Sequence, residues 1–138
     1  MCEKSMVNEV VSKYKTNNPY ELIEILNINL FFKPLGKVNG FLLKNKRNYF
    51  IYINSSLSQL ERRFTLCHEL GHFFMHKNFN TIFLNRGFNL TNKLENEANR
   101  FAIFLTLKNY QDIKDYDFTY FQIAKITGIP EKHLKLIL

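Results

Sequence analysis

The chain has 138 residues, a formal net charge of +7, and 46% hydrophobic residues that include 14 phenylalanines and 7 tyrosines. This length suits one domain with a single core and is short for two, and so apolar a composition excludes a disordered chain. No apolar run approaches the roughly 18 residues that cross a bilayer, and the first residues lack the pattern of a signal peptide. We therefore expect one globular, cytoplasmic domain over residues 1–138.

The basic charge is compatible with a nucleic-acid partner, an acidic protein partner or simple solubility. The lysines are scattered, and their only tight group, residues 44–47, has the composition of a turn. This group predicts a solvated hairpin tip, so nucleic acid is not the expected partner. Cys2 and Cys67 form no recognisable disulfide framework, and we expect both thiols to be reduced, with Cys67 packed in the core.

Two helices are expected at the start of the chain. Apolar residues recur at helical spacing over residues 3–15, which predicts an amphipathic helix. Asn18, Pro19 and Glu21 supply an N-cap, a proline in the first turn and an acidic third position. A short second helix should therefore follow and reach about Leu26.

A small sheet is expected next. Branched and aromatic residues predict three strands, at residues 28–33, 40–43 and 48–53, with Pro34 and Gly36 interrupting the chain between the first two. We expect the sheet to be antiparallel. Helices packed on such a sheet give an α+β fold.

The central helix is expected to begin at a capping box formed by Ser58 and Glu61 and to run to about His76. Apolar side chains surround much of this helix, so it should be largely buried. It contains an HExxH motif at residues 68–72, whose chemistry depends on which side chains share a face.

Within the motif, His68 and His72 lie one helical turn apart on one face, as two ligands of one small cation would, and Glu69 lies beside them. This pattern is typical of zinc hydrolases. A catalytic zinc ion takes three protein ligands and keeps a fourth position for water, so a third ligand is needed. His76 stands eight residues beyond His68, about 12 Å along a helix, which is too far for one ion.

The third ligand is expected from the next helix. Residues 77–91 predict a loop, whose residues Phe79, Phe83 and Phe88 should pack over the rim of a cleft. Asn92 followed by Glu95 resembles a second capping box, opening a helix that continues to about Leu107.

Glu95 is the preferred third ligand on this helix, with Glu97 as the alternative. At roughly 100° per residue, Glu95 shares a face with Asn99, whereas Glu97 is rotated by about 200° from Glu95. Asn99 is therefore placed to hydrogen-bond a ligand histidine.

The last part of the chain, residues 109–138, predicts a helical tail. One helix should begin near Asp117 and end at Gly128, and another should run from Pro130 to the C-terminus. Ala124 and Gly128 have the spacing of a helix-turn-helix, but the chain ends where a recognition helix would need to finish. We expect the tail to pack on the core.

Residues 63–72 and 95–102, which carry these motifs, are similar to the ImmA/IrrE family of metallopeptidases. The resemblance implies a small zincin-like domain with HExxH on a central helix, and a cytoplasmic zinc endopeptidase. It makes His68, His72 and Glu95 the zinc ligands and Glu69 the catalytic carboxylate. Members of this family, often encoded by phages and mobile elements, cleave a partner repressor, so a helix-turn-helix repressor is the expected substrate. Residues 104–108 depart from the family's usual helix end but leave these four positions intact.

The expected reaction is peptide hydrolysis, with Glu69 carrying the proton from water to the leaving amine. The substrate is expected as an extended segment against the strand at residues 48–53. Three tyrosines are available to stabilise the oxyanion: Tyr110, Tyr116 and Tyr120. The alternative function is that of a non-proteolytic regulator that binds a repressor or DNA, but such a module would not need the carboxylate of Glu69.

Overall fold

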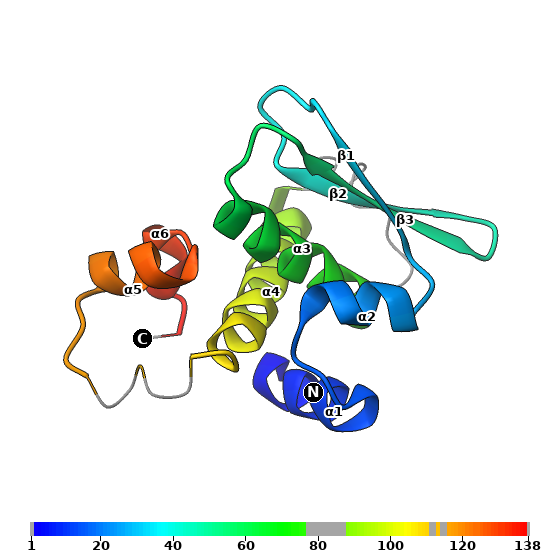
Figure 1. Ribbon diagram of the computed structural model, residues 1–138. Coiled ribbons are helices and arrows are strands. Elements are labelled where there is room, and N and C mark those ends of the chain that lie inside the picture. The colour runs from blue at the N-terminus through cyan, green and yellow to red at the C-terminus, as the bar shows by residue number, and fades with distance from the viewer. Residues whose placement is uncertain (1, 77–87, 111–112, 114–115, 138) are drawn as a thin grey trace.

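A computed structural model describes residues 2–76, 88–110, 113 and 116–137, and it has the α+β fold that the sequence predicts (Figure 1). These ranges contain six α-helices and one three-stranded sheet. In chain order the elements are α1 (Glu3–Tyr14), α2 (Pro19–Ile25), β1 (Asn29–Lys33), β2 (Gly40–Asn45), β3 (Asn48–Asn54), α3 (Gln59–Met75), α4 (Phe88–Leu107), α5 (Tyr120–Thr127) and α6 (Glu131–Leu134). None of these helices has the length and hydropathy of a membrane span.

The sheet is mixed, which corrects the expectation of an antiparallel one. The strand order is β1-β3-β2, and β3 pairs antiparallel with β2 but parallel with β1, where Leu30 lies opposite Ile51. The cause is the connection after β1, which crosses the end of β3 to reach the far edge. Asn54 holds this connection, because its side-chain amide donates to the carbonyl oxygens of Gly36 and Val38 at 2.9 Å each.

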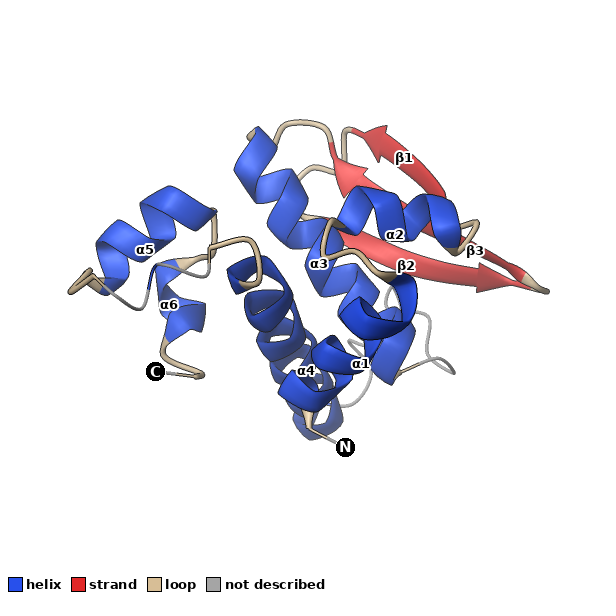
Figure 2. Cartoon of the chain, turned by 60° about the horizontal axis from the view of Figure 1, so that its bottom comes forward, coloured by secondary structure: helices blue, strands red, loops and turns tan. Residues whose placement is uncertain are grey.

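α3 packs against one face of the sheet (Figure 2). Leu42, Ile51 and Ile53 point from that face into the core, where they are fully buried. The opposite face carries a row of stacked rings, with the centroid of Tyr52 5.3 Å from that of Phe31 and 4.9 Å from that of Phe41. This alternation fixes which side of the sheet receives α3.

α3 begins where the sequence predicts, whereas α4 does not. α3 begins at the expected capping box, in which Ser58 Oγ accepts from the Glu61 amide and Glu61 Oε1 accepts from the Ser58 amide. α4 begins at Phe88, a full turn before Asn92, so the expected cap at Asn92 is wrong. The carboxylate of Glu95 contacts side chains of α3 instead of capping its own helix. Residues 77–87, with Phe79 and Phe83, and the side chain of Phe88 lie outside the described part of the chain.

The C-terminal part of the described chain contributes two short helices. α5 begins at a capping box of Thr119 and Gln122 and ends at Gly128, whose φ of 80° suits a residue without a side chain. α6 is a short helix of four residues and does not reach the C-terminus, in contrast to the expectation. Ile129 and Leu134 are fully buried in the core, so the tail is anchored by apolar contacts.

Gly71 allows α3 and α4 to cross closely. A Cβ atom on Gly71 would lie 3.0 Å from the carbonyl oxygen of Ala98 and 3.2 Å from the Cβ of Phe101. Because most Cβ contacts are longer than this, only glycine fits without displacement of α4. The close crossing brings the first turns of α4 against the HExxH segment.

We expect Gly71→Leu to destabilise the protein by about 1–3 kcal/mol, because overpacking outweighs the better helix propensity of leucine. Urea denaturation measures the change. Asn96→Leu is the control, since it adds the same side chain at an exposed position of α4. Equal stability of Gly71→Leu and the wild type would contradict the close crossing.

The two thiols differ strongly in their surroundings. Burial raises the pKa of Cys67 to about 12, whereas hydrogen bonds with Ser5 lower the pKa of the exposed Cys2. We expect a disulfide reagent at pH 8 to label one thiol rapidly in the native protein and the second only after unfolding, because the thiolate is the reactive form. Cys2→Ser should abolish the rapid phase, and rapid labelling that persists in this variant would show that Cys67 is accessible.

Candidate metal centre

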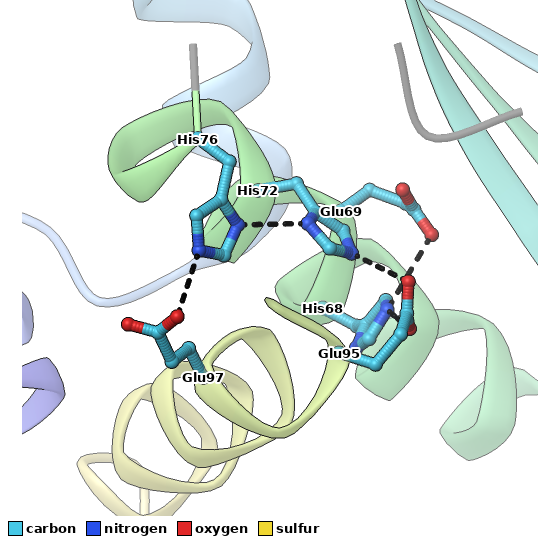
Figure 3. A network of polar contacts seen from close by, with 6 residues as sticks. All are labelled: His68, Glu69, His72, His76, Glu95 and Glu97. Atoms are coloured by element: carbon cyan, nitrogen blue, oxygen red, sulfur yellow. Dashed lines mark hydrogen bonds and ion pairs between the residues drawn. The ribbon is translucent and has the colours of Figure 1, made fainter. Parts of the chain in front are cut away.

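Three side chains from two helices meet beside the crossing of α3 and α4 (Figure 3). His68 and His72 come from α3 and Glu95 from α4. Glu95 Oε2 lies 2.9 Å from His68 Nε2, and Glu95 Oε1 lies 3.1 Å from His72 Nε2. One carboxylate thus contacts both imidazoles, and the candidate ligand atoms of the three residues all lie within 4.8 Å of one another.

This donor set fits a metal ion. The Nε2 atoms of His68 and His72 both face the carboxylate of Glu95, so an ion could reach all three residues with small shifts of their side chains. Two imidazole nitrogens and one carboxylate oxygen are a common set for catalytic zinc, which keeps a further position open.

The site shifts the pKa values of the three residues in different ways. Burial lowers the pKa of His72 to about 4, so the imidazole is neutral near pH 7 and one of its two ring nitrogens carries a lone pair. Burial acts to raise the pKa of Glu95, but hydrogen bonds from His68 and His72 hold it well below its usual range. Burial acts to lower the pKa of His68, yet the hydrogen bond that His68 donates to Glu95 and the charges of Glu69 and Glu95 raise it overall.

Glu69 is buried beside this group. Its Oε2 atom lies 4.0 Å from His68 Nε2, farther than either contact made by Glu95. Figure 3 shows its carboxylate directed toward the same space as the imidazoles of His68 and His72. The geometry therefore suits a carboxylate that acts on a bound water molecule without itself serving as a ligand.

The two residues that the sequence offers as alternative ligand or support lie at different places. Asn99 is buried next to His68 and raises the pKa of that imidazole, but no hydrogen bond of normal geometry reaches His68 Nδ1. Glu97 does not face the imidazoles of His68 and His72. Its Oε1 atom instead lies 3.5 Å from Nε2 of His76. In this geometry Glu95, and not Glu97, is within reach of an ion held by His68 and His72.

A cavity of about 360 Å³ opens beside the three residues. Its walls come from α3, α4, the segment before β2 and the C-terminal tail, and they include Asn39, Gly40, Thr65, Pro130 and His133. Because this cavity contains His68, Glu69 and Glu95, it is the candidate place for a substrate.

His133 is a cavity residue that sequence reasoning missed, whereas none of Tyr110, Tyr116 and Tyr120 lines the cavity. The His133 ring is stacked on Phe64 of α3, with ring centroids 6.2 Å apart and ring planes inclined by 18°. Burial and the nearby charge of Lys132 lower its pKa. Sequence spacing gives no signal for this residue, because only the return of the tail to α3 brings it to the cavity.

An HExxH helix crossed by a helix that adds a carboxylate, beside a cleft, defines a small zincin-like metallopeptidase domain. The chain belongs to the peptidase family described as the IrrE N-terminal-like domain, whose profile matches residues 23–132. This confirms the resemblance to the ImmA/IrrE family.

Two curated relatives are similar over most of the chain. One is the "Uncharacterized immunity region protein 2" of Bacillus phage phi105, 42% identical in an alignment that covers 96% of this chain and 87% of the relative. The other is "Metallopeptidase ImmA" of Bacillus subtilis (strain 168), 37% identical in an alignment that covers 92% of this chain and 78% of the relative.

Proposed function

We propose that the protein is a zinc-dependent endopeptidase that cleaves one specific protein partner in the cytoplasm, a helix-turn-helix repressor of a phage or mobile element. The meeting of Glu95 with His68 and His72, beside the buried Glu69, carries the proposal. The names of the two relatives, a metallopeptidase and a phage immunity-region protein, support the reaction and the biological setting.

His68, His72 and Glu95 would hold the zinc ion. When bound, zinc polarises the scissile carbonyl and makes a water molecule more acidic. Glu69 accepts a proton from the attacking water, whose oxygen bonds to the carbonyl carbon. Glu69 then donates this proton to the amine nitrogen as the C–N bond breaks. Burial of Glu69 keeps its carboxylate in place for both transfers.

The substrate peptide enters the cavity between the start of β2 and the tail. The earlier expectation of pairing with residues 48–53 is wrong, because β3 is the middle strand and has a partner on both sides. Asn39 and Gly40 lie on one wall of the cavity and His133 on the other, with His68 and Glu69 between them. A segment in this cavity brings its main chain to the proposed zinc site.

The decisive experiment incubates the zinc-loaded protein with the repressor encoded beside it. We expect one defined fragment pair, no cleavage after a chelator, and recovery when zinc is added back, because the water-activating ion is removed and restored. Mass spectrometry of the fragments identifies the bond. An intact repressor with the zinc-loaded protein would overturn this substrate, and cleavage that persists in chelator would overturn the metal mechanism.

A further inference from the structure

The two ring nitrogens of His72 face different partners. Its Nε2 atom faces Glu95, and its Nδ1 atom lies 2.9 Å from Nδ1 of His76. The other nitrogen of His76, Nε2, lies 3.5 Å from Oε1 of Glu97. Figure 3 shows these contacts as one chain from Glu95 through the two imidazoles to Glu97.

Both imidazoles in this chain are buried, with His72 0% and His76 6% exposed. Water is therefore not available as the partner of His72 Nδ1. A buried ring nitrogen without a hydrogen-bond partner is costly, and His76 supplies the partner of His72 Nδ1 one helical turn later. His76 is itself fixed at the end of α3, where its backbone amide donates to the carbonyl oxygen of His72 at 2.7 Å.

Metal binding through Nε2 of His72 allows only one arrangement of protons on the two imidazoles. If His72 binds a cation through Nε2, its neutral ring carries the proton on Nδ1 and donates it to Nδ1 of His76. His76 then carries its own proton on Nε2, which is the atom that faces the carboxylate of Glu97. The contact between the two imidazoles then has one donor and one acceptor. The proton on His76 Nε2 faces a carboxylate 3.5 Å away, within ion-pair distance but without a hydrogen bond of normal geometry.

We propose that His76, supported by Glu97, is a positioning residue that fixes the tautomer and the ring orientation of His72 for metal binding. The proposal rests on the ligand role of His72 in the proposed function. It assigns a task to Glu97, which the sequence offers as an alternative ligand, and to His76, which lies too far from His68 to share an ion with it. α4 then holds His72 at both nitrogens, directly through Glu95 and indirectly through Glu97 and His76.

The test measures the zinc dissociation constant of each variant by competition with a chelating dye. We expect His76→Phe to weaken zinc binding by about 10–100-fold, the usual effect of losing a partner behind a ligand. His76→Gln should recover part of the loss, because its amide oxygen can accept from His72 Nδ1. Glu97→Gln should weaken binding in the same direction, and Glu24→Gln, the same charge change at an exposed site of α2, should not.

Two further measurements separate positioning from a general structural effect. The melting temperatures of the metal-free variants should stay close to that of the metal-free wild type, although their zinc affinities differ. Long-range ¹H–¹⁵N NMR of the zinc-loaded wild type should find the proton of His72 on Nδ1 and that of His76 on Nε2. This measurement needs no variant, so it also decides the case in which His76→Phe fails to fold.

The outcomes distinguish this inference from the proposed function. Wild-type affinity in both His76→Phe and Glu97→Gln, or the opposite tautomer of His72, would overturn the positioning role while leaving the peptidase proposal intact. Weakened zinc binding in the variants, with no cleavage by the wild type, would support the positioning role and overturn the peptidase proposal. A wild-type protein that binds no zinc would overturn both.

Discussion

Glu69→Gln is expected to bind zinc as the wild type does and to lose nearly all cleavage of its protein substrate. Glutamine has almost the same shape but cannot accept the proton of the attacking water. General acid–base groups contribute about 10²–10⁴ in rate, so we expect a loss of at least this order. Cleavage rates and metal content by mass spectrometry measure the two effects on the same sample.

The control for this prediction is Glu9→Gln, the same charge change at an exposed position of α1. It should leave both cleavage and zinc content unchanged. Appreciable cleavage by Glu69→Gln would remove Glu69 from the role of proton carrier. Loss of zinc from this variant would instead make Glu69 a ligand, which the 4.0 Å separation from His68 Nε2 does not favour.

The alternative of a non-proteolytic regulator meets two obstacles in the structure. A carboxylate buried beside two imidazoles is costly to retain unless it has a task, and Glu69 occupies such a place. The tail that would bind DNA contributes Pro130 and His133 to the cavity, and it is anchored by buried Ile129 and Leu134. Salt-dependent DNA binding by the zinc-loaded protein, without cleavage of any repressor, would nevertheless favour this alternative.

Local sequence rules predict the elements well because their causes are local. The Ser58–Glu61 capping box fixes the start of α3, and the spacing of His68 and His72 places both imidazoles on one face of that helix. Glu95 could also be selected, because helical periodicity separates it from Glu97. These features need only the geometry of one helix at a time.

Features that depend on how separate segments meet could not be predicted. The parallel pairing of β1 with β3 follows from the connection between β1 and β2, which Asn54 holds. The composition of the strands does not predict this pairing. His133 reaches the cavity only because the tail folds back on α3. The contact between His72 and His76 follows from helical spacing. The proposed positioning role of this contact also needs Glu97, which comes from α4.

Glu95→Ala is expected to abolish stable zinc binding, whereas Glu97→Ala should only weaken it. Glu95 contacts both imidazoles at 2.9 and 3.1 Å and supplies the negative charge of the donor set, while Glu97 acts through His76. Loss of a group behind a ligand costs about 10–100-fold in affinity, so loss of the ligand itself should cost more than about 100-fold.

Zinc-dependent stabilisation provides the measurement for this pair of variants. A metal that binds only the folded state stabilises it by about 4 kcal/mol at a thousandfold excess over its dissociation constant. We expect zinc to raise the melting temperature of the wild type, to raise that of Glu97→Ala less, and to leave that of Glu95→Ala unchanged. The metal-free melting temperatures are the baseline for each variant. The opposite ranking would transfer the ligand role to Glu97, because loss of a direct ligand removes more of the zinc-dependent stabilisation than loss of a group behind a ligand.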